Sequence, residues 1–331
     1  MQKSLKILQD AQLALNKLDA ERAEENDSPL HSIDFRSHLL VADGSNGLHV
    51  QYDGEVWEDA FEIALTAIAQ AAPDIVSLKF MGPDEGANGL RTHDFAALLN
   101  TKAIFPNLLA LYIRPTDVAN HNFVDVDENQ LPALISRCPN LESLTIPCAP
   151  EPDFFNIKLS KLSYLRIGMG FQLYDFINNL AKSNNLPTLT VFDFSDSLSV
   201  FEADEPKGAP PNLPNFAENA AIFKQAGYDD AKIADMQKMA DEEFAKALAE
   251  LRFDDSYTSF AAYEALFKSK RLKKSAVFHL RNAYLTEAEF LQLHKMRPDL
   301  QFSLSLEASH VYVSHWAGKF SKPFKQLILN R

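Results

Sequence analysis

Few residues of this chain combine the types and the spacing that chemistry requires. Its two cysteines, Cys138 and Cys148, offer no disulfide framework and are typical of a reducing compartment. His310 and His315 form a close pair, but at this separation along a strand they face opposite sides of a sheet, which is wrong for a shared metal ion. With 11 glycines and no phosphate-binding loop, nucleophile elbow or pair of catalytic carboxylates, the sequence predicts no cofactor and no catalytic site.

One acidic run resembles part of a calcium-binding site. Residues 125–129 read Asp-Val-Asp-Glu-Asn, which is similar to the start of a calcium loop. The sixth position is Gln130 where such a loop needs glycine, and the twelfth is Ser136 where it needs glutamate. We therefore expect this run to be the cap and first turn of a following helix.

A repeated pattern of apolar residues positions the remaining candidates. An apolar residue, two variable ones, an apolar one, one variable and a last apolar one recur at intervals of 33, 33, 21 and 27 residues. Such a period is typical of a solenoid of strand-plus-helix units. Because alternate strand residues point to opposite faces, each copy needs neighbours to bury its apolar side. The copies are Ile75–Phe80, Leu108–Ile113, Leu141–Ile146, Leu162–Ile167 and Leu189–Phe194.

The segments between the copies have the spacing of amphipathic helices. A proline two residues before the first apolar strand position is expected to end each helix, at Pro73, Pro106, Pro139 and Pro187. The strands should then form one parallel sheet with helices on one side. The parallel sheet predicts, as its most testable consequence, that Leu111, Leu144, Leu165 and Phe192 are buried in one layer. The expected helices cover Phe95–Leu99, Leu131–Ile135, Leu173–Leu180 and Phe260–Phe267.

These residues resemble the leucine-rich-repeat family in its ribonuclease-inhibitor-like form, and the whole chain is similar to uncharacterised bacterial cytoplasmic repeat proteins. The closest match is Cys138–Ile146, and weaker copies begin at Ser275 and Pro298. The resemblance implies an α/β leucine-rich-repeat solenoid, with a curved parallel sheet on the concave side, helices on the convex side and an acidic helical insertion. It also implies that Cys138 is a core residue. The usual asparagine after each strand is replaced here by Pro83, Thr116, Ala149, Gly170 and Ser197.

The exposed face of that sheet holds the residues best suited to binding. The residue between the last two apolar positions of a copy points away from the core, as do those two positions before and after it. Tyrosine and arginine are enriched at interface hot spots, and they recur here on copies that we expect to be neighbouring strands. As single residues, they could equally be ordinary solvated strand residues. The predicted partner-binding set is Tyr112, Arg114, Tyr164, Arg166, Asp193, His279 and Arg281.

Charge is uneven along the chain. Residues 196–255 hold 14 Asp and Glu against 6 Lys and Arg, a balance of −8 out of the net −13. This acidic stretch interrupts the repeats. It contains an apolar stripe with helical spacing, which predicts a helix that packs on the solenoid. The stripe is Ile233, Met236, Phe244 and Leu251, and the expected hinge lies near Pro210 and Pro211. The expected parts are a helix and hairpin cap over 1–56, repeats over 57–195, the acidic insertion over 196–256, and further repeats with a cap over 257–331.

The sequence favours a non-enzymatic protein-interaction module of the cytoplasm, with an inhibitor or immunity-type protein as one form of it. The acidic balance disfavours nucleic acid, no apolar run is long enough to span a membrane, and the arginines suggest a protein partner with an anionic contact surface. The alternative is an enzyme, or an enzyme subunit, with its site between the acidic insertion and the concave face.

Overall fold

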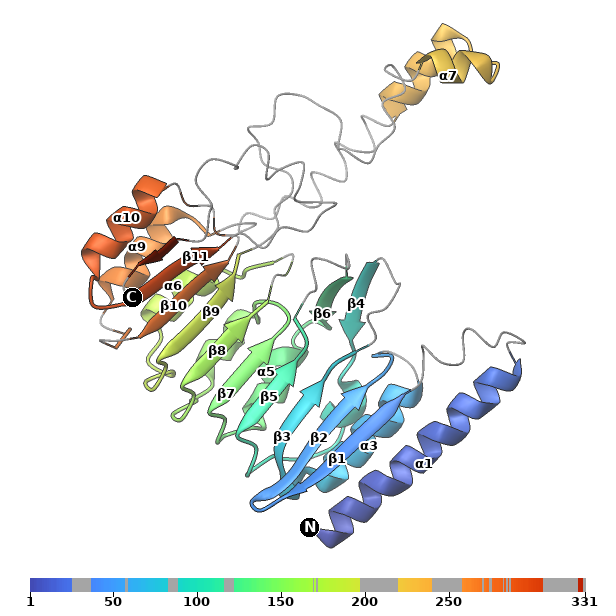
Figure 1. Cartoon of the computed structure of the whole chain (residues 1–331), viewed down its shortest axis with the longest axis vertical. Coiled ribbons are helices and arrows are strands. Elements are labelled where there is room, and N and C mark those ends of the chain that lie inside the picture. The colour runs from blue at the N-terminus through green and yellow to red at the C-terminus, as the bar shows by residue number, and fades with distance from the viewer. Residues whose placement is uncertain are drawn as a thin grey trace.

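A computed structural model describes residues 1–25, 37–56, 59–82, 89–115, 122–168, 170, 172–196, 220–239, 258–269, 271–273, 276–281, 283, 285, 287–305 and 327–329. Among these residues the chain forms a mixed α/β structure around one ten-stranded open sheet (Figure 1). The sheet strands are β1 (His38–Gly44), β2 (Gly47–Asp53), β3 (Ile75–Phe80), β5 (Ala110–Ile113), β7 (Ser143–Ile146), β8 (Tyr164–Ile167), β9 (Val191–Ser195), β10 (Val277–Arg281), β11 (Gln301–Ser305) and β12 (Leu327–Leu329).

Strands β2 to β11 pair in parallel, in the order β2-β3-β5-β7-β8-β9-β10-β11. The outer strands β1 and β12 pair antiparallel with β2 and β11. This confirms the predicted α/β class, the parallel sheet and the predicted hairpin within residues 38–52. The two weaker copies also form strands, as β10 and β11.

The core consists of apolar side chains stacked in register across the sheet. The layer Leu78, Leu111, Leu144, Leu165, Phe192, Phe278 and Phe302 runs through seven strands, and each of these side chains is at most 1 % exposed. The predicted stacking of Leu111, Leu144, Leu165 and Phe192 is therefore confirmed. The first apolar position of a copy is also buried; it begins β3 as Ile75, and in the four later copies it lies two residues before the strand, as Leu141 does.

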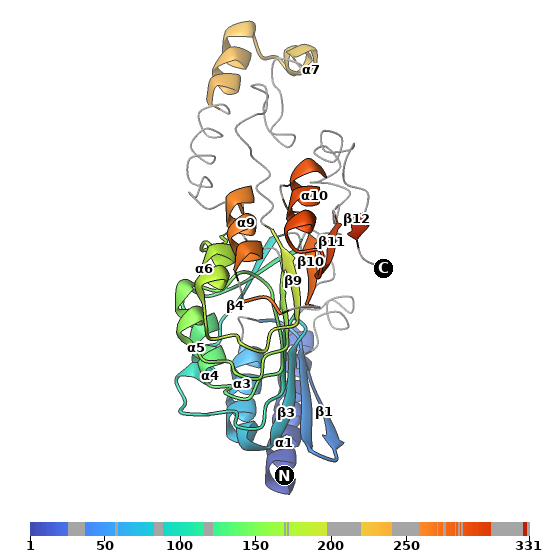
Figure 2. The same cartoon turned by 90° about the vertical axis from the view of Figure 1, so that its left-hand side faces the viewer.

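Helices cover one face of this sheet, as Figure 2 shows. The covering helices are α3 (Asp59–Ala71), α4 (Ala96–Leu99), α5 (Gln130–Ser136), α6 (Phe176–Lys182), α9 (Phe260–Lys268) and α10 (Glu287–Met296), with the 3-10 helices η1 (Ala72–Asp74) and η3 (Pro152–Asn156). The predicted helices within 95–99, 131–135, 173–180 and 260–267 are confirmed. Only η1 contains its proline. Residues 100–105, 137–138 and 183–186 separate α4, α5 and α6 from Pro106, Pro139 and Pro187, so proline does not end these helices.

Side-chain amides join the turns that precede the strands. Asn107 donates from Nδ2 to the carbonyl of Pro73 at 2.7 Å, and Asn140 donates in the same way to Pro106 at 2.7 Å. Each Pro-Asn turn therefore satisfies a carbonyl of the turn one repeat earlier, 34 residues away in both cases. Arg137 caps α4 by donating to the carbonyls of Leu98 and Thr101 at 3.1 and 2.9 Å.

The amino-terminal helix α1 (Gln2–Glu25) packs against α3 and β1 (Figure 1). Its residues Leu8 and Leu15 are fully buried. The amide oxygen of Gln12 accepts a hydrogen bond from the backbone of Leu39, on the outer strand β1. Since an open sheet edge is a site of unwanted pairing, this contact makes α1 a cover for that edge.

A second small sheet was not predicted. The parallel strands β4 (Gly89–His93) and β6 (Asn122–Val126) lie in the loops that follow β3 and β5. Asp125 thus belongs to a strand rather than to a helix cap. The predicted helix does follow, as α5, but Asn129 precedes it in the left-handed conformation (φ 64) and its side chain makes no cap hydrogen bond.

The described part of the acidic stretch contains two helices, α7 (Ala220–Gln225) and residues 230–239. Both views show this unit standing away from the sheet (Figures 1 and 2). Ile233 is buried within the unit, whereas Ile222 and Met239 are 63 % and 68 % exposed. The prediction that this helix packs on the sheet is therefore wrong for residues 230–239, while Phe244, Leu251, Pro210 and Pro211 lie outside the described residues.

Candidate functional site

The parallel register arranges the predicted binding residues in rows on the face opposite the helices. One row crosses the sheet through Lys79, Tyr112, Thr145, Arg166, Asp193, His279 and Ser303, each paired with the next. Tyr164 lies two residues before Arg166, while Arg114 and Arg281 lie two residues after Tyr112 and His279. All seven predicted residues therefore occupy one face, which we call the strand face.

An ion pair organises the β9–β10 part of the strand face. Arg281 donates from Nε and Nη2 to the two oxygens of Asp193, at 2.5 and 2.9 Å. The Asp193 side chain is 6 % exposed, so this two-point bond keeps a buried carboxylate satisfied. Asp193 and Arg281 thus bind each other, a pairing that the sequence-based set did not anticipate.

Arg166 approaches the same carboxylate without bonding to it. Its Nε lies 4.0 Å from Oδ2 of Asp193, which is beyond hydrogen-bond distance. This Nε is buried and has no hydrogen-bond partner, although the side chain as a whole is 31 % exposed. Two arginines beside one aspartate leave one excess positive charge at this point.

Tyr112 and Tyr164 lie on either side of β7, whose strand-face residues Ser143 and Thr145 are small. The expectation that their strands are neighbours is wrong, because β7 lies between β5 and β8 and places Thr145 between Tyr112 and Arg166. Thr145 is only 5 % exposed. Burial raises the pKa of Tyr164, and Asp193 and Tyr112 add to this shift while Arg166 and Arg281 oppose it. The Tyr164 hydroxyl therefore stays protonated at neutral pH and can donate a hydrogen bond.

A serine and a histidine meet on the last two parallel strands. Nδ1 of His279 lies 2.5 Å from Oγ of Ser303, which is 9 % exposed. Asp193 stands beside His279 in register, so the row reads Asp-His-Ser across β9, β10 and β11. His279 directs Nδ1, the nitrogen that the acid of a catalytic triad holds, to Ser303 rather than to Asp193, so Asp193 does not orient the imidazole as a triad requires.

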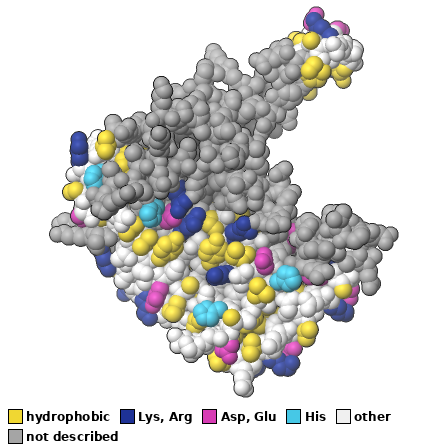
Figure 3. All heavy atoms as spheres, viewed as in Figure 1, with side chains coloured by type: hydrophobic (Ala, Val, Ile, Leu, Met, Phe, Trp, Pro, Cys, Tyr) yellow, Lys and Arg dark blue, Asp and Glu magenta, His cyan; other side chains and the backbone are white. Residues whose placement is uncertain are grey.

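The strand face is cationic in an acidic chain. We count the row that contains Arg166, together with the positions two residues before and two residues after it, on β3 to β10. These positions hold Lys79, Arg114, Arg166 and Arg281 against Asp193, so four positive charges and one negative give a net +3, where the whole chain is −13. Figure 3 shows Lys, Arg and hydrophobic side chains gathered near the middle of this face. The surface thus combines positive charge with apolar area, which suits an interface.

Asp196, at the end of β9, is a buried residue that the sequence did not single out. Its carboxylate accepts hydrogen bonds from the backbone and hydroxyl of Thr258, at 3.1 and 3.2 Å, and from the hydroxyl of Tyr263 at 2.8 Å. Asp196 is fully buried. It joins the two ends of the stretch between β9 and α9, a role that lies outside the strand face.

The two cysteines give no sign of nucleophilic chemistry. Cys138 is fully buried as expected, and burial raises the pKa of its thiol to about 12. Burial also raises the pKa of Cys148 well above its ordinary value, and its Sγ donates to Asp125 at 3.1 Å. Both thiols are therefore protonated at neutral pH and poor nucleophiles.

No group of three or more His, Cys, Asp or Glu residues within the described ranges could hold a metal ion. His310 and His315 lie outside these ranges. None of the helices described is both long and apolar enough to cross a membrane.

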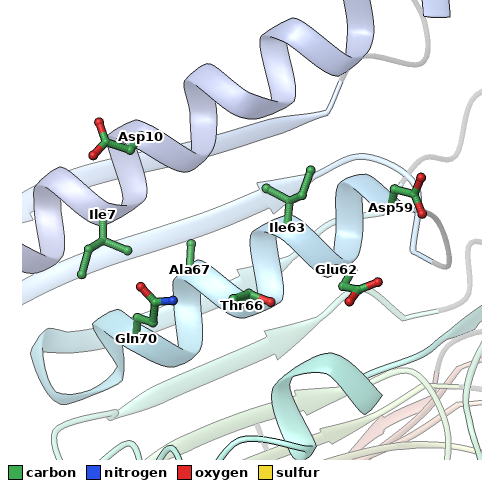
Figure 4. A pocket seen from close by; sticks show the side chains of 8 residues that line it. All are labelled: Ile7, Asp10, Asp59, Glu62, Ile63, Thr66, Ala67 and Gln70. Carbon is green, nitrogen blue, oxygen red and sulfur yellow. The ribbon is translucent and has the colours of Figure 1, made fainter.

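An open groove of about 490 Å³ lies between α1 and α3 (Figure 4). Ile7 of α1 and Ile63 and Ala67 of α3 line it, together with Asp59 and Glu62. These two acids lie in the first turn of α3, where a negative charge stabilises a helix. Stabilisation of the helix thus accounts for these two acids.

No protein family model matches this chain, and comparison with curated proteins finds no match. Function must therefore be inferred from the geometry of the strand face.

Proposed function

We propose that this chain is a leucine-rich-repeat type solenoid that acts as a non-enzymatic interaction module and binds a protein partner on its strand face. The in-register repeats support the solenoid, as do the Pro-Asn turns that bond to each other from one repeat to the next. An inhibitor or immunity-type role is one form that such binding could take.

The observation that carries the proposal is the Tyr112, Tyr164 and Arg166 cluster on a cationic face that the described helices leave uncovered. The buried Nε–H of Arg166 has no hydrogen-bond partner among the described residues. Leaving such a donor unsatisfied costs about 1 to 3 kcal/mol of stability, which a bound partner would recover. Aromatic and arginine side chains around a desolvated centre are the usual composition of a hot spot.

The test uses capture of partners from the native lysate by the intact chain, followed by affinity measurement on the purified pair. Replacing Tyr164 and Arg166 together by alanine should weaken binding by at least about 2 kcal/mol, or roughly thirtyfold. The circular dichroism spectrum should not change, because both side chains are partly exposed.

A matched control removes one cation and one large side chain from the helix side. Lys182→Ala combined with Leu291→Ala changes exposed residues of α6 and α10 and should leave affinity unchanged. If the control weakens binding as much as the strand-face variant does, the partner does not dock on the strand face.

The alternative function is an enzyme, and one observation favours it. The Ser303 hydroxyl bonded to the His279 imidazole is the kind of pair that activates a nucleophile. A fluorophosphonate probe should label Ser303 in the intact chain, and not in His279→Gln, if this pair is catalytic. The interaction module predicts no labelling of either protein.

A further inference from the structure

The unmet hydrogen-bonding capacity of the strand face is concentrated at Arg166. Its Nε–H is buried without a partner, and the nearest carboxylate is already held at both oxygens by Arg281. A buried donor of a charged group is rarely left unsatisfied in a working protein, so an acceptor from outside the described structure is expected at this position.

Two further donors lie on the strand face near Arg166: Tyr164 is two residues earlier on β8, and Tyr112 is in the same row on β5. The hydroxyls of Tyr112 and Tyr164 are near enough to influence each other, and neither has a hydrogen-bond partner among the described residues. Thr145, in register between Tyr112 and Arg166, is only 5 % exposed, so the residue between them is largely desolvated. One guanidinium and two phenol groups are thus offered to one ligand.

We propose that Arg166, Tyr112 and Tyr164 bind the carboxylate of an aspartate or glutamate side chain of the protein partner. This rests on the proposed function, and it names the chemical group that docks at the centre of the strand face. The Arg281–Asp193 pair borders this site: Arg281 is bonded to both oxygens of Asp193, while Nε of Arg166 stays 4.0 Å from Oδ2 of that carboxylate.

Charge favours a carboxylate over a phosphate. A guanidinium fork with neutral hydroxyl donors matches a single negative charge in a planar group. A phosphate carries more charge and is generally bound by several cations, whereas Asp193 cancels one of the two arginine charges here. The chain's net charge of −13 also opposes a polyphosphate partner.

The probe for this site is a blocked glutamate, N-acetyl-glutamate N-methylamide, titrated into the intact isotope-labelled chain at constant ionic strength. We expect saturable NMR shifts at the Arg166 Nε–H and at the backbone amides of Thr145 and Arg166. The blocked glutamine has the same shape without the charge, and it should cause no saturable shift.

Arg166→Gln should raise the midpoint of the glutamate titration, read at the Thr145 amide, by at least about tenfold, because a charged hydrogen bond is lost. Lys182→Gln removes the same charge from α6 on the helix side and should leave the midpoint unchanged. Arg166→Lys keeps the charge but loses the fork, and should give an intermediate midpoint.

Three results would overturn the carboxylate site: equal binding of the blocked glutamine, an unchanged midpoint in Arg166→Gln, or a lower midpoint for inorganic phosphate. Failure of the proposed function is a separate outcome. If Tyr164→Ala with Arg166→Ala leaves partner affinity unchanged, the strand face is not the interface, whatever the blocked glutamate does.

Discussion

At the scale of single residues, Asp196 holds the fold together where the acidic stretch leaves the sheet. Its carboxylate receives hydrogen bonds from Thr258 and Tyr263, which lie 62 and 67 residues further along the chain. Burial and Asp196 raise the pKa of Tyr263 well above its ordinary value, so its hydroxyl remains a donor. The side chain of Asp196 thus closes a long loop.

Replacing Asp196 by alanine should therefore destabilise the chain by about 3 kcal/mol, since it leaves several buried donors unsatisfied. Urea unfolding followed by circular dichroism measures this free energy. Asp43→Ala, at an exposed position of β1, should change it by less than about 0.5 kcal/mol. Equal losses in the two variants would show that the Asp196 contacts contribute nothing.

His93 makes stability depend on pH. It is 1 % exposed and stacks on Phe95, and burial lowers its pKa to about 4. Between pH 6.5 and 4 the unfolded chain binds a proton at His93 that the folded chain does not bind. Stability from this residue is thus complete above pH 6.5 and is lost as the pH falls toward 4.

Lowering the pH from 7.5 to 5 should cost about 2 kcal/mol of unfolding free energy through His93. His93→Phe keeps an aromatic ring and should remove most of this difference, whatever its stability at pH 7.5. His49→Phe, at an exposed position of β2, should retain the difference. A full pH dependence in His93→Phe would assign the effect to other groups.

At the scale of elements, stacking of the central strands dominates the energetics. Leu144 is fully buried between Leu111 and Leu165 in the β7 position of the core layer. Leu144→Ala should cost about 2 to 5 kcal/mol, because transfer energy is lost and a cavity remains. Leu40→Ala, at a side chain that is 54 % exposed on β1, should cost less than about 1 kcal/mol in the same urea experiment.

The strands could be predicted because period-2 alternation within a 21 to 33 residue repeat has a single physical explanation. The small sheet could not, since β4 reads Gly-Leu-Arg-Thr-His and has no alternation. The contact between Asp196 and Thr258 could not either, because a bond across 62 residues leaves no periodic signal.

The strand register determines how much of the candidate site could be predicted from the sequence. Once the strands align, Tyr112, Arg166 and Asp193 must share a face. The sequence does not determine which charged groups pair, because Arg166 and Arg281 both lie within reach of Asp193. In the structure Asp193 pairs with Arg281, and the Nε–H of Arg166 is left without a hydrogen-bond partner.

At the scale of the whole molecule, the two faces of the sheet differ in what covers them and in charge. The helices bury one face of the sheet, and the opposite face gathers positive charge in a chain of net charge −13. A complementary acidic partner would approach this face faster at low salt, because exposed charges steer association and salt screens them. The helical unit around α7, where Tyr228 is 40 % exposed, is the alternative surface on which a partner could dock.

The central claim is that a protein partner covers the strand face, and hydroxyl-radical footprinting of the intact chain with its captured partner tests it most directly. Tyr112 and Tyr164 report on the strand face, and Tyr228 reports on the helical unit as an internal control. The proposal predicts that the partner slows oxidation of Tyr112 and Tyr164 while Tyr228 reacts at its free rate. Unchanged oxidation of Tyr112 and Tyr164, with Tyr228 protected, would contradict it and place the interface on the helical unit.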